Sequence, residues 1–381
     1  MQRYVFFYKK QNNGLKVCVS AFDCPKTAQN SPAIFEIMPK IAKFDGESVQ
    51  QNVKAMKMIH IALPDSGQRP LPFYLAMEEW VAAKLPAADY FFCWQVRPTV
   101  IFGRNQSIDT EVDLEYCNSH NIEVYRRKSG GGCVFADMHN IMFSYITPTE
   151  EVTTTFSRYT ETIAAMLRSL GLDAEATGRN DVTIGGRKVS GNSFYHVPGR
   201  SIVHGTMLYD TDLEHMAHAI TPSRSKLESK QVQSVSSRIT TLSKHLTMDI
   251  DAFKRFACDF LTDSKITLTA EQIAEIEALA QPYFMPEWIF GRHCRTALNR
   301  TRRIEGSGEF TVGIELKGGL IADITVGGDF FQLCDIDSAL LARLRGTRYT
   351  PDDIRHALSD IDVSQIIAGL STSEFIKLLI Q

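Results

Sequence analysis

Apolar residues recur at helical spacing in two long segments of the chain. In residues 72–85, Phe73, Met77, Trp80 and Val81 fall on one side of a helix with 3.6 residues per turn. The apolar residues of segment 153–170 follow the same spacing: Phe156, Tyr159, Ile163, Met166, Leu167 and Leu170. Gly171 then stands where a helix typically ends. The pattern predicts two amphipathic helices, each with one face against a core.

Short β-rich segments surround these helices. They are residues 56–64 (MKMIHIALP), where regular patterning begins, 98–103 (PTVIFG), 122–127 (IEVYRR) and 141–147 (IMFSYIT). A shorter helix is predicted over residues 212–220. Helices intermixed with hairpin-like strands predict an α/β (α+β) fold with a mixed, largely antiparallel sheet. We assign this pattern to one domain, residues 56–262.

The C-terminal third has a different pattern. Residues 263–287 look helical and linker-like, and Thr269 and Gln272 have the spacing of a capping box. In residues 288–381, two alternating segments flank LKGGL, which is typical of a β-hairpin, and short amphipathic helices follow. The sequence therefore predicts a helical linker at 263–287 and a small α/β accessory domain at 288–381.

Residues 1–55 are polar and weakly periodic. We expect them to be an extension upstream of the first domain, with Met56 or Met58 as the natural first residue. A dispensable lobe and a targeting segment are the alternatives.

Composition excludes several classes of protein. With 381 residues, of which 44% are apolar, the chain is long enough for two domains with sizeable cores. A net charge of −3 gives no basic field for nucleic acid or an anionic membrane surface. No apolar run approaches the roughly 20 residues of a membrane-spanning helix. The eight cysteines are scattered, without a C-x-x-C pair, which favours a reduced, cytoplasmic protein without a structural metal.

The stretch RRKSGGGCVF, residues 126–135, combines positive charge with three glycines between two predicted strands. Backbone N–H groups in such a turn can face one concave surface, which a phosphate can approach closely because glycine has no Cβ. Arg126 and Arg127 would add planar donors suited to a phosphate or carboxylate. A flexible hairpin with solvated arginines is the other reading. Neither a P-loop nor a G-x-G-x-x-G motif is present.

A second stretch, GRNDVTIGGRKVSGNSF (residues 178–194), predicts a hairpin that turns at Gly185–Gly186. A two-residue turn there would pair residues 184 with 187, 183 with 188, 182 with 189 and 181 with 190. One face would then be polar and would carry Asp181, Thr183, Lys188 and Ser190. This hairpin either shows a polar edge to water or aims the Lys188 ammonium at an activated phosphate ester.

These two stretches, followed by VHGTMLYDTDL and SVSSRITTL in this order, resemble the lipoate–protein ligases, and so does the earlier GRNQ at 103–106. The resemblance covers roughly residue 58 to the C-terminus. It implies a catalytic domain of the biotinyl/lipoyl protein ligase type, followed by the small accessory domain of the long form. It also implies a reaction in two steps. Lipoate and Mg²⁺–ATP give lipoyl-AMP, and the lipoyl group then passes to a lysine of a carrier protein.

The resemblance carries specific roles to matching positions. Lys188 would be catalytic. The nucleotide and lipoate would be held by Arg127, Ser129, Gly130, Gly131, Gly132, Cys133, Val134, Phe135, Asn180, Asp181 and His204. Asp181 either binds Mg²⁺ or pairs with Lys188, and His204 either lines the pocket or is structural. Val134, Phe135 and strand 141–146 are candidate walls for the apolar tail of lipoate.

The implied cofactors are ATP and Mg²⁺, with lipoate as substrate. The implied partners are the lipoyl domains of 2-oxoacid dehydrogenase complexes and the glycine-cleavage carrier protein. The chain departs from the family pattern at Ala136, where histidine is common, and at His139, where glycine is common. Two alternatives stay open: an ATP-independent octanoyl- or lipoyl-transferase with Cys133 as nucleophile, and a non-catalytic lipoate-binding protein.

Overall fold

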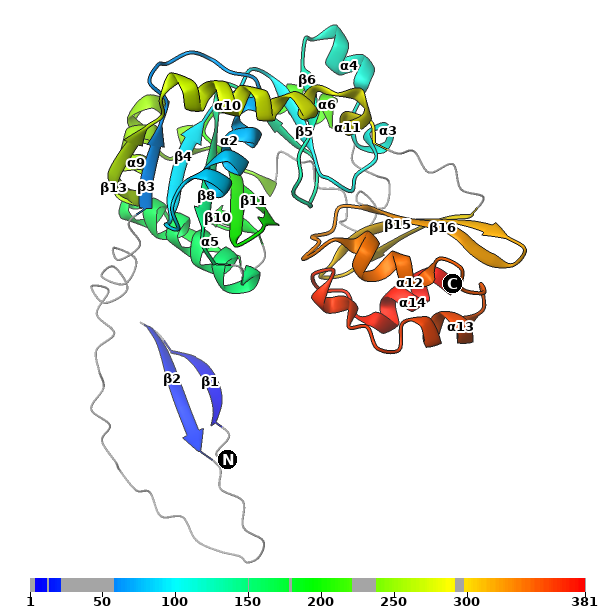
Figure 1. Ribbon diagram of the computed structural model, residues 1–381. Coiled ribbons are helices and arrows are strands. Elements are labelled where there is room, and N and C mark those ends of the chain that lie inside the picture. The colour runs from blue at the N-terminus through cyan, green and yellow to red at the C-terminus, as the bar shows by residue number, and fades with distance from the viewer. Residues whose placement is uncertain are drawn as a thin grey trace, which may run out of the picture. The chain divides into compact units, whose positions relative to one another are not determined.

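The computed structural model describes residues 4–11, 14–21, 58–149, 151–177, 180–220, 238–291 and 298–380 (Figure 1). The chain divides into two compact units, Met1–Asp45 and Gly46–Gln381. In the first unit, β1 (Tyr4–Gln11) and β2 (Gly14–Ala21) form an antiparallel hairpin, where the sequence had shown little pattern. Most of the predicted extension, residues 22–55, lies outside the described residues.

The second unit is organised around an eight-stranded sheet. In spatial order its strands are β13 (Thr262–Thr267), β3 (Met58–Ala62), β4 (Tyr90–Trp94), β8 (Asn140–Thr147), β12 (Arg200–Leu208), β11 (Arg187–Val197), β10 (Asp181–Ile184) and β9 (Ala174–Ala176). The pairs β13–β3 and β3–β4 are parallel, and the other five are antiparallel. The predicted mixed, largely antiparallel sheet is confirmed.

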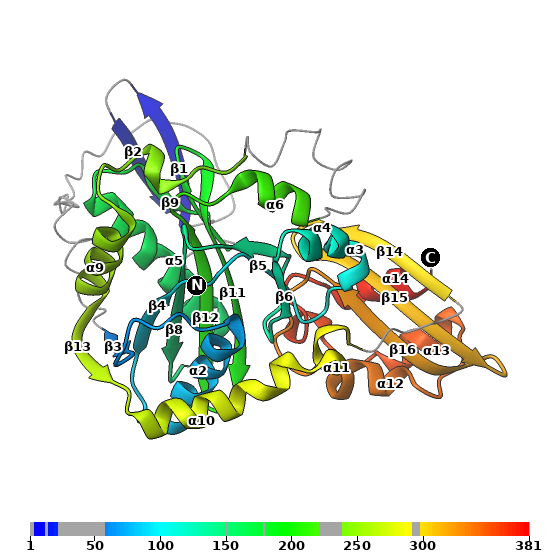
Figure 2. The same ribbon diagram turned by 90° about the horizontal axis from the view of Figure 1, so that it is seen from above.

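Helices cover both faces of this sheet. Figure 2 shows α2 (Leu71–Lys84) and α10 (Ala270–Ala280) on one side, and α5 (Val152–Ser169) and α9 (Ile250–Leu261) on the other. Alternation along β4 supplies both cores: Phe92 packs with α2 and α10, whereas Phe91 packs with α5 and α9. The strands are therefore buried on both faces, which explains why β8 is buried along its whole length.

Helix α2 differs from its predicted form. We expected one apolar stripe, but the helix is buried on nearly all sides, including Glu78, because it lies between the sheet and α10. Segment 263–287, expected to be a linker, is also part of the main sheet and of the core around α2. It supplies strand β13 to the edge of the sheet, and Ile273 and Ile276 of α10 are buried in the same core as α2.

A smaller sheet stands beside the main one and consists of β6 (Glu123–Arg126), β5 (Thr99–Phe102) and β7 (Val134–Ala136). Its own core includes residues of α3 (Ile108–Glu111), α4 (Leu114–Ser119) and α6 (Leu213–Ala219). The glycine stretch connects β6 to β7 within this small sheet. It also contacts the main sheet, because Ser129 and Gly130 form hydrogen bonds with His204 of β12 and Ser193 of β11.

The C-terminal domain has a three-stranded antiparallel sheet, β14 (Leu298–Ile304), β15 (Gly308–Lys317) and β16 (Leu320–Gly328), with its own core. The longer helices that follow are α13 (Pro351–Ala357) and α14 (Thr372–Ile380). The predicted hairpin is present, with Gly318 and Gly319 both at positive φ. Within the described ranges, no helix is long and apolar enough to cross a membrane.

Candidate functional site

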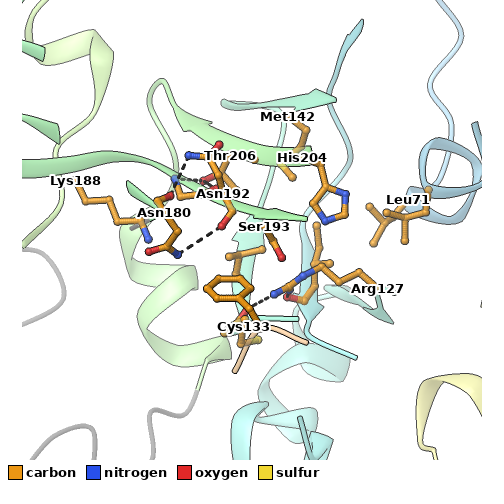
Figure 3. A pocket seen from close by; sticks show the side chains of 18 of the residues that line it. Leu71, Arg127, Cys133, Met142, Asn180, Lys188, Asn192, Ser193, His204 and Thr206 are labelled. Carbon is orange, nitrogen blue, oxygen red and sulfur yellow. Dashed lines mark hydrogen bonds between the residues drawn. The ribbon is translucent and has the colours of Figure 1, made fainter. Parts of the chain in front are cut away.

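One pocket brings together most of the residues singled out in the sequence (Figure 3). It lies between the glycine bend, residues 129–133, and the strands β11 and β12, with Asn180 just before β10 also in its wall. Eight of the predicted residues line it: Arg127, Gly131, Gly132, Cys133, Val134, Asn180, Lys188 and His204. The two motif regions, about 55 residues apart in the chain, therefore share one cavity.

Both arginines before the glycines are buried, not solvated. Arg126 is 6% exposed and Arg127 5% exposed. Arg126 donates from Nη1 to the carbonyl oxygens of Arg104 and Gln106, each at 2.7 Å, and from Nε to the carbonyl of Trp288 at 3.0 Å. Burial lowers the pKa of each guanidinium to about 10. The buried guanidinium of Arg126 thus holds the backbone carbonyls of Arg104, Gln106 and Trp288 in place.

Arg127 holds the glycine bend in shape. Its Nη2 donates to the carbonyl oxygens of Gly130 (2.6 Å) and Gly132 (2.7 Å), and its Nη1 to that of Ile101 (3.0 Å). Its Nε donates to Ser129 Oγ at 2.9 Å. With these carbonyls turned inward to the guanidinium, a phosphate in the pocket would meet backbone N–H groups and not carbonyl oxygens.

Behind the bend, a buried hydrogen-bond chain runs through Glu78, His204 and Ser129. His204 Nδ1 lies 2.9 Å from Glu78 Oε2, and its Nε2 lies 2.6 Å from Ser129 Oγ. A carboxylate can only accept, so Nδ1 donates to Glu78. In the neutral imidazole, Nε2 then accepts from the Ser129 hydroxyl, which in turn accepts from Arg127. We call this the Glu78–His204–Ser129 chain.

Glu78 is a residue behind the candidate site that the sequence analysis did not single out. It is fully buried and also accepts hydrogen bonds from Ser144 Oγ (2.5 Å) and Tyr195 (3.4 Å). A buried carboxylate is costly unless its partners satisfy it, which marks Glu78 as more than a helix-surface charge. The one available signal was an acidic residue within a mostly apolar helix segment, AMEEWVAA.

The hairpin that carries Lys188 has a different register from the predicted one. Residues 184 and 187, and 183 and 188, pair as expected, but a bulge at Val189 then pairs Val182 with Ser190 and Asp181 with Gly191. The extra residue lets Val189 stay buried with Val182 while Ser190 also turns inward. Ser190 was predicted on the polar face and is 2% exposed.

Lys188 forms an ion pair with Asp181, with Nζ 2.7 Å from Oδ1. The lysine head also lies beside Gly191, where a Cβ would meet Nζ and Cε at less than 3.0 Å. Glycine at this position therefore gives the ammonium room to lie along the strand. Asn180 borders the same wall, and Asn192 Nδ2 donates to its carbonyl oxygen at 3.0 Å. Arg179 and Gly178 of this motif lie outside the described residues.

Another part of the pocket is apolar and is lined by Leu71, Leu75, Trp94, Ile101, Val134 and Met142. Phe331 adds an apolar wall beside the glycine bend. The Trp94 indole is held by Ser144 Oγ at 2.9 Å and stacks on Tyr74. Of the walls expected from sequence, Val134 and Met142 line the pocket, whereas the Phe135 side chain packs in the core of the small sheet.

The C-terminal domain completes one side of the pocket. Gly131, which has φ of 83°, donates its N–H to the carbonyl of Phe330 at 3.1 Å. A Cβ on Gly131 would meet the Phe331 ring at 3.0 Å, so the bend and this loop are in close contact. Gly130 borders a neighbouring cavity, and its carbonyl also accepts from Ser193 Oγ at 2.8 Å.

Comparison with known proteins agrees with the resemblance found in the sequence. Residues 70–261 match the family model described as the lipoyl protein ligase A/B catalytic domain, and residues 295–379 match the one described as the bacterial lipoate protein ligase C-terminus. Lipoate–protein ligase 1 of Staphylococcus aureus is 33% identical over 317 residues, which cover 80% of this chain and 95% of that protein.

Two solved structures share the fold. P. falciparum LipL1 in complex with lipoate matches with a TM-score of 0.66 and 17% identity, over 85% of this chain and 98% of that one. A lipoate–protein ligase A bound with ATP matches with a TM-score of 0.52 and 23% identity, over 62% of this chain and 99% of that one.

Proposed function

This chain belongs to the lipoate–protein ligase family, and from that premise we propose that its pocket carries both steps of an ATP-dependent ligation. In the first step, a lipoate carboxylate oxygen attacks the α-phosphorus of ATP and pyrophosphate leaves. In the second, the amine of a carrier-protein lysine attacks the acyl carbon, loses a proton, and AMP leaves. The single observation that carries the proposal is that Lys188 and the glycine bend line the same pocket, beside an apolar slot.

Lys188 is the proposed catalytic residue, since both steps place negative charge on the α-phosphate. An ammonium held by one carboxylate can stay near the phosphate oxygens while the bond changes from phosphoanhydride to acyl-adenylate. Asp181 positions that ammonium by its 2.7 Å contact.

The proposed nucleotide contacts come from backbone. Gly132 and Cys133 lie at the pocket wall, and a Cβ on Gly132 would meet no atom within 4 Å, so the space above this residue is open for a ligand. Arg127, through its bonds to the bend, and His204, through Ser129, support this wall from behind. Arg127 and His204 are therefore site residues that position the glycine bend.

Magnesium enters this scheme as part of the substrate, bound to ATP. Mg²⁺ in nucleotide sites is held mainly by phosphate oxygens and water, with one or two carboxylates from the protein. Among the described residues, no cluster of three or more His, Cys, Asp or Glu could hold a metal by itself. Asp181 Oδ2 is the carboxylate oxygen that we propose for the Mg²⁺ side of the nucleotide, directly or through water.

The apolar slot suits the tail of lipoate, whose chain and dithiolane ring have no charge. Leu71, Trp94 and Met142 line this slot beside the polar end of the pocket, so a carboxylate would face the glycine bend while the tail is buried. For the acceptor, we propose the lipoyl domains of 2-oxoacid dehydrogenase complexes and the glycine-cleavage carrier protein. We further propose that the reaction takes place in the cytoplasm.

Lipoate-dependent exchange of pyrophosphate into ATP tests the proposal. Wild-type protein and Cys133→Ser should exchange at similar rates, whereas Lys188→Ala should lose on the order of 10²-fold, the scale of one preorganised donor to a developing charge. Absence of exchange in wild-type protein would support the ATP-independent transferase or the non-catalytic lipoate-binding protein, because neither forms an adenylate. Near-normal exchange by Lys188→Ala would reject the role of Lys188.

A further inference from the structure

A second group of reactive side chains lies away from the pocket, where α9 packs on strands β3 and β4. Sγ of Cys93 on β4 lies 3.8 Å from Sγ of Cys258 on α9. The same Cys258 sulfur lies 3.8 Å from Nε2 of His60 on β3. Both thiols are part-buried, and both pack against the core on the α5–α9 side of the sheet.

We propose that Cys93 and Cys258 are a peroxide-reactive dithiol that closes to a disulfide between β4 and α9. The site is separate from the pocket because strand alternation sends Cys93 and Trp94 to opposite faces of the sheet. The inference therefore does not depend on the proposed ligation chemistry.

The surroundings make the two thiols unequal. A hydrogen bond from the Cys258 thiol, together with the positive charge of Lys254, lowers the pKa of Cys93. The neighbouring Cys93 sulfur and burial raise the pKa of Cys258. Lys254 is fixed one turn before Cys258, with Nζ 2.6 Å from Gln95 Oε1 and 2.7 Å from Asp251 Oδ1. The ammonium of Lys254 is bound two residues from Cys93, and His60 lies beside Cys258, so we assign Cys93 as the attacking thiolate and Cys258 as the resolving thiol.

The chemistry balances with a peroxide as oxidant. The Cys93 thiolate attacks one oxygen of hydrogen peroxide, which breaks the O–O bond, releases hydroxide and leaves Cys93 as sulfenic acid. Cys258 then passes its proton to His60 Nε2, and its thiolate attacks the Cys93 sulfur and expels hydroxide. With protons returned to both hydroxides, two thiols and one peroxide give one disulfide and two waters.

The geometry permits closure. The sulfurs must approach from 3.8 Å to about 2.05 Å, the length of a disulfide bond. Rotation about the two Cα–Cβ bonds and a small shift of α9 toward the sheet can supply this approach. Peroxide is barely larger than water, so partial burial of the thiols does not exclude it. By contrast, Cys117 is fully buried, and burial raises its pKa to about 11.

The first experiment maps the cross-link in the full chain. Reduced protein is treated with hydrogen peroxide, quenched with catalase, alkylated, digested without reductant and analysed by mass spectrometry. We expect a Cys93–Cys258 linked peptide, absent from Cys93→Ser and Cys258→Ser and still present in Cys334→Ser, which removes an exposed thiol elsewhere. Oxidised wild-type protein should also melt higher than reduced protein, by about 5 °C or more, because the bond closes a long loop.

A second experiment assigns the direction of attack. Dimedone traps sulfenic acid, so peroxide with dimedone should label Cys93 in Cys258→Ser, where no resolving thiol is left. It should leave Cys258 unlabelled in Cys93→Ser. If either variant fails to fold, the corresponding alanine variant or trapping in wild-type protein answers the same question. Two outcomes would overturn the proposal. In the first, peroxide oxidises Cys334 or Cys133 and leaves Cys93 and Cys258 as free thiols. In the second, dimedone labels Cys258 before Cys93.

Discussion

Replacing Glu78 with glutamine tests whether the Glu78–His204–Ser129 chain positions the glycine bend or only fills the core. The change keeps size and shape but replaces one acceptor oxygen with an NH₂ group. Ser144 (2.5 Å) and His204 (2.9 Å) both donate to the carboxylate. In one orientation of the amide its NH₂ group faces the His204 N–H, and in the other the Ser144 hydroxyl must turn to accept from it while His204 donates to a neutral oxygen. Either way, charge-assisted hydrogen bonds are lost, and His204, the partner of Ser129, is held less tightly.

The expected magnitude follows from these contacts. A hydrogen bond to a charged group contributes about 1.5–3 kcal/mol, and a buried donor left without a partner costs about 1–3 kcal/mol. We therefore expect Glu78→Gln to lower the free energy of unfolding by about 3 kcal/mol. If the bend loses about 2 kcal/mol of its preorganisation toward the transition state, the rate of adenylate formation falls roughly 30-fold.

Two measurements separate the two roles of Glu78. Urea unfolding gives the stability, and lipoate-dependent ATP–pyrophosphate exchange under fully folded conditions gives the rate. Tyr195→Phe is the matched control, because it removes only the 3.4 Å contact to Glu78 and keeps the carboxylate, so exchange should change by less than about threefold. If Glu78→Gln loses stability as expected but exchanges pyrophosphate within twofold of wild type, the chain does not position the bend.

Two further predictions follow from packing. In Gly103→Ala the new Cβ would lie well inside 3.0 Å of the Gly131 carbonyl oxygen, a backbone atom that cannot rotate away, so we expect a lower melting temperature and at least tenfold slower pyrophosphate exchange. Gly132→Ala is the matched variant, because its Cβ would meet no atom within 4 Å. It should keep the wild-type melting temperature and lose affinity for ATP. Ile276→Ala, at a buried position of α10, should lower the free energy of unfolding in urea by about 2–5 kcal/mol. Leu279→Ala, on the exposed side of the same helix, should lower it by less than about 1 kcal/mol. Equal effects would mean that residues 263–287 are a linker and not part of the core.

Much of this protein could be predicted from local sequence. Periodicity predicted helix 153–170 and the C-terminal hairpin, because an amphipathic helix and a Gly-Gly turn depend on neighbours in the chain. The glycine bend and Lys188 were found through short motifs, since phosphate chemistry requires bare amides and a compact cation. Their meeting in one pocket was an expectation that only the fold could test.

Tertiary structure decided what each side chain does. Arg126 and Arg127 have a sequence pattern typical of a phosphate site, yet burial beside inward carbonyls makes them supports of the backbone. Read along the chain, Glu78 looks like helix surface and Trp94 like core. Glu78 reaches His204 because α2 packs on the sheet, and Trp94 lines the pocket because β4 is only one strand, β8, away from β12. Burial, and therefore the strength of every charge and hydrogen bond, depends on residues far away in sequence. For that reason the sequence determined which chemistry is available, and packing determined which atoms perform it.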